Sequence, residues 1–226
     1  MSGVTCTVLV VAKAPVAGLA KTRLAADVGP EAAADLAAAA LLDTLDTVRS
    51  LDATAHVVAL TGDLGLARCA DELREVLADF VVLDQRGDGL DERLAAAHAD
   101  AATVAPGPVL QIGMDTPQVT SELLRTSAES LAAWDVGGVL GPATDGGWWA
   151  LGLSDPRAAQ FLVGVPMSRP DTGERTLAGL ERAVGTVVRL PELADVDTVA
   201  DLWPVALLQP ADRRFRRAVE LLGLPR

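Results

Sequence analysis

The sequence has little of several residue types, and each shortage excludes a class of protein. Its 226 residues include no Tyr, two Cys, two His and two Lys. Two cysteines exclude a small domain held together by disulfides. His56 and His98 are far apart, and Cys6 and Cys69 lack the spacing of a zinc site. We interpret both cysteines as buried free thiols.

The sequence also lacks the features of membrane and nucleic-acid-binding proteins. No apolar run approaches the roughly 18 residues that a membrane helix needs. The N-terminal run Val8–Ala12 is short and no basic residue precedes Lys13, which is not the layout of a signal peptide. A net charge of −12 opposes binding to a phosphate backbone, and we interpret the basic run Arg213–Arg217 as a solvated helix face. We therefore expect a cytoplasmic protein with no nucleic-acid or membrane partner.

Half of the residues are apolar, which is enough for the core of one domain of ordinary size. Short Val- and Leu-rich runs alternate with Ala- and Leu-rich stretches, a pattern typical of a largely parallel sheet covered on both faces by helices. The runs predict strands at Thr7–Ala12, Ala55–Leu60, Phe80–Asp84, Val109–Gly113, Gly137–Pro142, Trp148–Leu153 and Thr186–Leu190. The stretches predict helices at Pro30–Ser50, Gly65–Leu77, Asp91–Thr103, Ser121–Trp134, Asp155–Leu162, Gly173–Ala183, Thr198–Leu208 and Ala211–Leu222. The expected architecture is a single α/β domain over residues 1–226, a three-layer α/β/α sandwich whose mostly parallel sheet becomes mixed after about residue 136.

Both lysines lie in the loop that follows the first predicted strand, AKAPVAGLAKTRL. In open α/β sheets, ligands bind at the carboxyl ends of the strands. A loop there that combines Gly18 with Lys13, Lys21 and Arg23 can hold phosphates through backbone N–H groups and charge. The loop is neither a P-loop nor a dinucleotide fingerprint. The alternative is a solvated loop whose charges have no ligand.

Two acidic motifs supply candidate metal ligands. Asp115, in QIGMDTP, ends the fourth predicted strand, where it can hold Mg²⁺ or Mn²⁺ between phosphate oxygens; the alternative is a cap on the following turn. In LADVDTVADL, Asp195 and Asp197 point the same way if the segment is extended. Asp197 is equally placed to begin the next helix as its N-cap, with Asp201 in the first turn.

A glycine-rich motif, GPATDGGWWALG, joins the two strands of the predicted hairpin. Gly146 and Gly147 allow a ligand to approach the backbone closely, and the motif holds two of the four Trp residues, Trp148 and Trp149. The alternative is an ordinary hairpin with one Trp in the core.

In this order, AKAPVAGLAKTRL, QRGDGLDERL, QIGMDTP, LGPATDGGWWALGL and DVDTVADL resemble the bacterial DUF2064 proteins. These are glycosyltransferase-like members of the nucleotide-diphospho-sugar transferase superfamily, which has the GT-A fold. The resemblance runs from about Val8 to Leu202. The first motif also resembles the K-T-R-L loop of 2-phospholactate guanylyltransferases. The resemblance implies a GT-A-like fold with the nucleotide site at the carboxyl ends of the strands.

The resemblance also implies roles for individual residues. Those on the nucleotide side are Ala12, Lys13, Gly18, Lys21, Arg23 and Asp88. Asp115 is the implied metal ligand, and Asp195 or Asp197 is the second. Those on the acceptor or sugar side are Asp145, Gly146, Gly147 and Trp148. The sequence departs from the family at Asp91, where a Gly is usual, at Met167, where an aromatic is expected before Ser168, and at Trp148 and Trp149, which replace Tyr-like residues.

The leading hypothesis is a metal-dependent transferase that uses a nucleotide donor, either a nucleoside triphosphate or a nucleotide sugar, and a small-molecule acceptor. Lys21 and Asp115 are the expected catalytic residues, with Mg²⁺ or Mn²⁺ as the cofactor. The three cations of the first loop slightly favour nucleotidyl over glycosyl transfer. One alternative is a protein that binds a nucleotide without chemistry. Another is that the charges are surface residues sharing no site.

Overall fold

The computed structural model describes residues 3–225, in which seven strands form one sheet of order β3-β2-β1-β4-β6-β5-β7. Every neighbouring pair is parallel except the pairs that β6 makes with β4 and β5. The strands are β1 (Val4–Lys13), β2 (Ala53–Thr61), β3 (Val81–Asp84), β4 (Val109–Gly113), β5 (Gly138–Pro142), β6 (Trp148–Leu153) and β7 (Val187–Arg189). The predicted mixed and mostly parallel sheet, with its β5–β6 hairpin, is confirmed.

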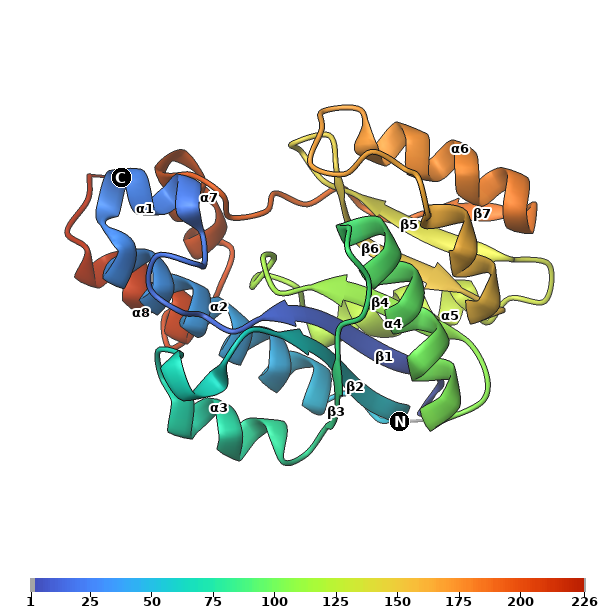
Figure 1. The fold of residues 1–226 in the computed structure, drawn as a ribbon, viewed down its shortest axis with the longest axis horizontal. Helices are drawn as coiled ribbons and strands as arrows, with labels where there is room; N and C mark the ends of the chain where they lie inside the picture. Colours follow the sequence, from blue (N-terminus) through green and yellow to red (C-terminus); the bar gives the residue numbers. More distant parts are fainter. Residues whose placement is uncertain (1–2, 226) are drawn as a thin grey trace.

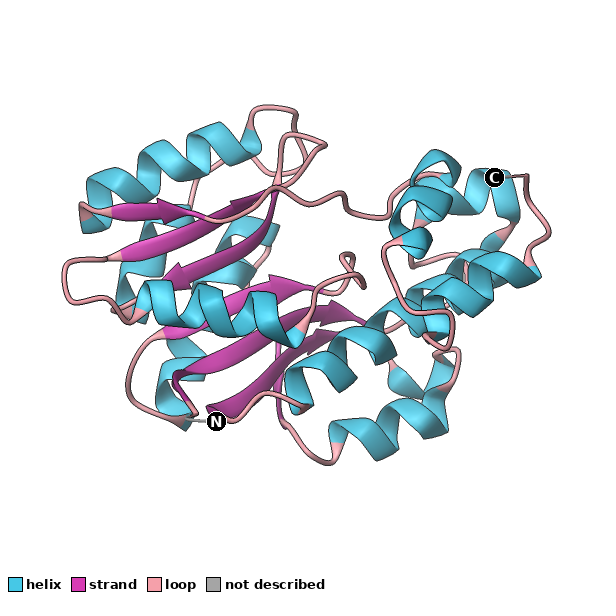
Figure 2. Ribbon diagram, turned by 180° about the vertical axis from the view of Figure 1, so that it is seen from behind, coloured by secondary structure: helices cyan, strands magenta, loops and turns pink. Residues whose placement is uncertain are grey.

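Helices cover both faces of the sheet, which gives the predicted three layers (Figures 1 and 2). The α-helices are α1 (Thr22–Val28), α2 (Pro30–Arg49), α3 (Ala70–Leu77), α4 (Leu90–Val104), α5 (Ser121–Leu131), α6 (Thr172–Val184), α7 (Val199–Leu207) and α8 (Arg214–Leu221). The described residues also form two 3-10 helices, η1 (Leu64–Leu66) and η2 (Pro156–Leu162). Helices α2, α3 and α5 pack on one face, and α4, η2 and α6 pack on the other. No helix in residues 3–225 has the length and apolar character to cross a membrane.

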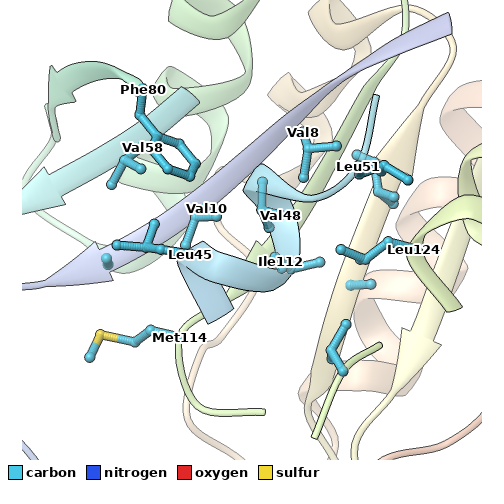
Figure 3. Close-up of a cluster of buried hydrophobic side chains, with 14 of the residues drawn as sticks. Val8, Val10, Leu45, Val48, Leu51, Val58, Phe80, Ile112, Met114 and Leu124 are labelled. Atoms are coloured by element: carbon cyan, nitrogen blue, oxygen red, sulfur yellow. The ribbon is translucent and has the colours of Figure 1, made fainter. Parts of the chain in front are cut away.

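The main core lies between the sheet and α2 (Figure 3). Val8 and Val10 of β1 and Ile112 of β4 are fully buried, and they contact Leu45 and Val48 of α2 in the same cluster. Burying each such side chain contributes about 1.5–3 kcal/mol. These central strands are apolar on both faces because helices cover both. The core therefore fixes the strand ends that carry the predicted site.

The C-terminal helices form a second cluster at one end of the molecule, where α1, α7 and α8 gather around the start of α2 (Figure 1). Phe215 of α8 and Leu24 of α1 are both fully buried there. The interpretation of Arg213–Arg217 as a solvated face is wrong for its first residues. Asp43, with 0% of its surface exposed, accepts backbone hydrogen bonds from Arg214 and Phe215, and both Arg213 and Arg214 form ion pairs with it. The basic run thus anchors α8 on α2.

Four local features differ from the prediction. Helix α1 was not predicted, because its seven residues are too few for a periodic pattern; it ends at Gly29, where φ is +86°, immediately before α2. The helix expected from Gly65 to Leu77 is instead the short η1 followed by α3. The helix expected from Asp155 is the 3-10 helix η2, at whose start the Asp155 carboxylate accepts a hydrogen bond from the Arg157 N–H. Cys6 is buried as predicted, but Cys69 is exposed, since it stands before α3 in the left-handed region rather than inside the helix.

Candidate active site

A cavity of about 370 Å³ opens at the carboxyl ends of β1 and β4. Its walls come from these strand ends, the start of α4, the β5–β6 hairpin, the loop before α6 and the segment before α7. The cavity is thus assembled from every motif that the sequence singled out. Predicted site residues that line it are Ala12, Lys13, Asp115, Asp145, Gly147, Trp148 and Asp195.

In the loop that follows β1, each cationic side chain has a different partner. The Lys13 ammonium donates to the carbonyl of Leu19 at 2.7 Å, which closes the loop on itself. Gly18 has φ of +77°, and nothing lies within 4 Å of where a Cβ would be, so its backbone faces open space. Arg23 forms an ion pair with Asp197.

Lys21 joins three parts of the chain. It adopts the left-handed conformation (φ 49°) just before α1, and its ammonium lies 2.6 Å from Asp115 Oδ1 and donates to the carbonyl of Val196. Its side chain is 10% exposed, compared with 45% for Asp115. The loop after β1, the end of β4 and the segment before α7 therefore meet at one cation. This contact contradicts the hypothesis that these charges share no site.

The structure separates Asp195 from Asp197. Asp195 is half-buried and lines the cavity. Its pKa is raised to about 6, first by burial and then by the neighbouring carboxylates of Asp145 and Asp115, against the opposing effect of Lys21. Asp197 instead pairs with Arg23, and it does not cap α7.

The cap of α7 is Thr198. The Asp201 carboxylate accepts from the Thr198 N–H at 2.7 Å and from the Thr198 hydroxyl at 2.9 Å. The alternative in which Asp197 is the N-cap is therefore wrong, and the expected place of Asp201 in the first turn is confirmed.

The donor set around Asp115 suits a hard divalent cation. Mg²⁺ in nucleotide sites commonly takes one or two carboxylates and completes its shell with phosphate oxygens and water. Asp115 and Asp195 supply such carboxylates. The pKa of Asp195 is raised first by burial and second by neighbouring carboxylates, whose charge a bound cation would offset. Within residues 3–225, no three His, Cys, Asp or Glu side chains are grouped so as to hold a metal ion on their own. A divalent ion here would depend on the donor's phosphates for its remaining ligands.

The β5–β6 hairpin contributes both structure and cavity wall. Gly146 has φ of +88°, and a Cβ there would lie 2.0 Å from the carbonyl oxygen of Pro170. The close approach expected for a ligand at Gly146 is thus made by the protein's own backbone, which corrects that prediction. Gly147 lines the cavity and donates its N–H to Asp145 Oδ1 at 2.7 Å.

The two tryptophans of the hairpin have different environments. Trp149 is buried, and its indole N–H donates to the carbonyl of Pro191. Trp148 is half-buried, lines the cavity and donates to the Thr176 hydroxyl at 3.2 Å. Trp149 therefore belongs to the core, as in the alternative of an ordinary hairpin, and both tryptophans border the cavity.

The QRGDGLDERL motif contributes Gln85, Leu90, Arg93 and Leu94 to the cavity wall, but not the residue that was expected there. Asp88 is exposed, and it is not among the residues that line the cavity. Asp91, which stands in place of the family's Gly, accepts a hydrogen bond from the Gly164 N–H at 2.7 Å, and this bond lowers the pKa of its carboxyl group. Asp91 thus ties the start of α4 to the segment that leads from η2 to the cavity wall.

Several cavity residues were not predicted. Gln85, just after β3, donates its amide to the carbonyls of Ala12 and Ala59, both at 2.9 Å. A polar residue directly after a strand was a usable signal for Gln85. Gln111 was visible as the polar residue of an otherwise apolar strand. The remaining unpredicted polar residues of the wall are Thr61, Arg93, Thr116, Ser168, Arg169 and Thr172.

The family model described as "Uncharacterized protein conserved in bacteria (DUF2064)" matches residues 44–169, more than half of the chain. The chain belongs to the DUF2064 family. No curated protein matches the sequence.

Solved structures extend this result to the fold. A protein from Desulfovibrio desulfuricans G20, provisionally described as a nucleotide-diphospho-sugar transferase, is 27% identical with a TM-score of 0.78 over 98% of this chain and 95% of that one. A cytidylyltransferase from Leptospira borgpetersenii is 12% identical with a TM-score of 0.56, over 98% and 94% of the two chains. Glucosyl-3-phosphoglycerate synthase from Mycobacterium tuberculosis, crystallised with Mn²⁺ and UDP, is 11% identical with a TM-score of 0.53, over 99% and 82%. The DUF2064 chain therefore has the fold of the nucleotide-diphospho-sugar transferases, as its sequence motifs indicated.

Proposed function

We propose that this DUF2064 protein is a metal-dependent transferase that takes a nucleotide donor and a small-molecule acceptor. The observation that carries the proposal is the contact of Lys21 with Asp115 at the edge of a cavity that Asp195 also lines. A cation next to carboxylates at the carboxyl ends of parallel strands is the arrangement that a nucleotide phosphate with its metal requires. The named activities of the structural neighbours, which include cytidylyl and glucosyl transfer, support a transferase.

The first loop is the proposed phosphate site. Lys21 and Arg23 are held by carboxylates in the structure, so both side chains are already fixed in place before a donor arrives. Lys13 is exposed, and its ammonium has to break only its hydrogen bond to the Leu19 carbonyl to reach a phosphate. Gly18 leaves the loop backbone open to a bulky anion. Ala12 and Gln85 then border the side on which the nucleoside lies.

Asp115 and Asp195 are the proposed metal ligands, and Asp197 is not, because it lies outside the cavity wall and is paired with Arg23. When bound, Mg²⁺ or Mn²⁺ supplies charge neutralisation on the donor phosphates and stabilises the leaving group. Lys21 remains beside Asp115, where its ammonium adds to this stabilisation.

Two reactions fit this arrangement, and nucleotidyl transfer is the proposed one. In it, an acceptor oxygen bonds to the α-phosphorus, the bond from that phosphorus to the α–β bridging oxygen breaks, and pyrophosphate leaves with the electron pair while the acceptor's proton passes to solvent. In glycosyl transfer, the acceptor oxygen bonds to the sugar's anomeric carbon and a nucleoside diphosphate leaves. Three cations in the first loop favour the donor with the larger phosphate charge. Detection of pyrophosphate or of nucleoside diphosphate distinguishes the two reactions.

The metal ligands can be tested with two neighbouring variants. Calorimetric titration of nucleoside triphosphates with Mn²⁺ should show metal-dependent binding to the wild-type protein that is weakened about tenfold or more in Asp115→Asn and Asp195→Asn. Glu192→Gln is the matched control, since it removes one negative charge from the same segment, outside both the cavity wall and the ion pair that holds Arg23.

Unchanged affinity in Asp115→Asn and Asp195→Asn would contradict the proposed metal site. Metal-dependent nucleotide binding with no turnover across a broad set of acceptors would leave a nucleotide-binding protein without chemistry.

A further inference from the structure

The cavity wall also carries polar residues that the proposed donor site does not use. Two are arginines, Arg93 from the first turns of α4 and Arg169 from the loop before α6. Two more are the buried side chains of Gln111 in β4 and Thr116, each 2% exposed. This region is called the arginine wall below, and it consists of Arg93, Arg169, Gln111 and Thr116.

Neither arginine of this wall has an ion-pair partner among residues 3–225, although the chain has 31 acidic residues against 19 basic ones. Arg93 donates through Nε to the carbonyl of Gly87 at 3.0 Å, which leaves the rest of its guanidinium for a ligand. Arg169 has Asp171 within electrostatic reach, but that carboxylate accepts from Arg175 Nε at 2.6 Å.

The lack of ion pairs at Arg93 and Arg169 differs from the first loop, where Lys21 and Arg23 each form an ion pair with a carboxylate. Two guanidinium groups that form no ion pair within residues 3–225 therefore line the same cavity as the carboxylates of the proposed metal site. Guanidinium groups match carboxylates and phosphates in shape and in hydrogen-bond geometry.

Two polar side-chain atoms of the arginine wall also lack hydrogen-bond partners within residues 3–225. Within the described chain, the Gln111 Oε1 and Thr116 Oγ1 atoms are buried and have no partner at hydrogen-bond geometry, although the Gln111 side chain lies close enough to His98 to raise the pKa of that ring. Leaving a buried polar group unpaired is costly, so such groups normally meet a ligand or water. The Gln111 oxygen can accept from a ligand hydroxyl, and the Thr116 hydroxyl can donate to or accept from one.

We propose that the acceptor is a small hydroxylated anion, with its carboxylate or phosphate on Arg93 and Arg169 and its hydroxyl groups over Gln111 and Thr116. This inference rests on the transferase function proposed above, since it assigns the acceptor side of the same cavity. The hydroxyl oxygen is then the atom that forms the new bond, and the anionic group stays on the arginines and orients it. The cavity of about 370 Å³ suits a small acceptor beside the nucleotide.

Three probes with a common three-carbon skeleton test the charge requirement: glycerate, glycerol phosphate and glycerol. Their dissociation constants can be measured by ligand-observed NMR on the wild-type protein, with and without a bound nucleoside triphosphate. We expect at least one of the anions to bind about tenfold or more tightly than glycerol. The preferred anion shows whether the arginine wall selects a carboxylate or a phosphate.

Substitution of the two arginines tests whether the anion binds at the arginine wall. Arg93→Met and Arg169→Met should each weaken the preferred anion about tenfold, because each removes a charge-assisted contact. Arg182→Met, on α6 outside the cavity wall, is the matched control and should bind as the wild type does. Since Arg93 also supports the Gly87 carbonyl, Arg169→Met gives the independent check, and the melting temperature of each variant confirms that it is folded.

Nucleotide titrations on the same proteins separate this inference from the proposed function. Nucleotide binding with no preference for anions over glycerol would overturn the arginine wall as an acceptor site and leave the transferase intact. Variants that lose nucleotide but keep the anion would also overturn it, since the arginines would then belong to the donor. Failure of the wild type to bind any nucleotide would remove the proposed function and, with it, this inference.

Discussion

His98 makes the stability of this protein depend on pH. It lies on α4 with 0% of its surface exposed, and both ring nitrogens are buried without a hydrogen-bond partner in residues 3–225. Burial lowers the pKa of His98 from 6.5 to about 4. The folded protein therefore keeps the ring neutral under conditions in which the unfolded chain protonates it.

The sign and size of the effect follow by linkage. Below pH 6.5 the unfolded chain binds a proton that the folded chain does not, so the free energy of unfolding falls as the pH falls towards 4. Each pH unit in this interval costs about 1.4 kcal/mol, and the whole interval costs about 3 kcal/mol. His98→Leu removes the titrating group and fills nearly the same space, so this part of the pH dependence should vanish.

Urea unfolding followed by tryptophan fluorescence at pH 4.5–7.5 measures the effect. The wild type should lose about 3 kcal/mol relative to His98→Leu as the pH falls, and comparing the two proteins cancels the contribution of every other titrating group. Parallel curves for the two proteins, or a wild type that gains stability on acidification, would refute the reasoning.

Two further predictions concern buried groups away from the cavity. Asp43→Ala should cost about 3–5 kcal/mol in the free energy of unfolding, because it leaves the N–H groups at the start of α8 and the charge of Arg213 without their buried acceptor; a loss below about 1 kcal/mol in urea unfolding would contradict this network. A thiol reagent should modify one cysteine per native chain, the exposed Cys69, and the second only after unfolding, because Cys6 is buried and burial raises its pKa to about 11. Mass spectrometry of the labelled peptides checks the assignment, and native labelling at Cys6 would refute it.

The sequence predicted the strands well because central parallel strands are apolar on both faces. Val109–Gly113 is confirmed residue for residue as β4. Structure that depends on a few residues was missed. Helix α1 is shorter than two full periods of an amphipathic pattern, and nothing near Cys69 in the sequence shows that its backbone is left-handed, with φ of 52°.

The site was predictable where residues follow a strand and not where they lie inside an element. Lys21 and Asp115 come from loops at strand ends, and parallel strands bring such loops together. Arg93 lies in a regular helix, and Gln111, although it is the polar residue of β4, lies in a strand whose sequence does not show which face meets the cavity. Their direction towards the cavity depends on how α4 packs on the sheet, which the local pattern does not contain. The choice between Asp195 and Asp197 likewise depended on the position of Arg23.

The central claim is that a nucleotide's phosphates bind at Lys21 beside Asp115, and a melting-temperature screen tests it most directly. The wild type and Lys21→Met would be heated with each nucleoside triphosphate and nucleotide sugar, with and without Mg²⁺ or Mn²⁺. At 100 times the dissociation constant, binding adds about 2.7 kcal/mol, which should raise the melting temperature of the wild type by about 5–10 °C with one nucleotide class when metal is present. The account predicts that this rise is lost in Lys21→Met. No rise with any nucleotide, or an equal rise in the variant, would contradict it.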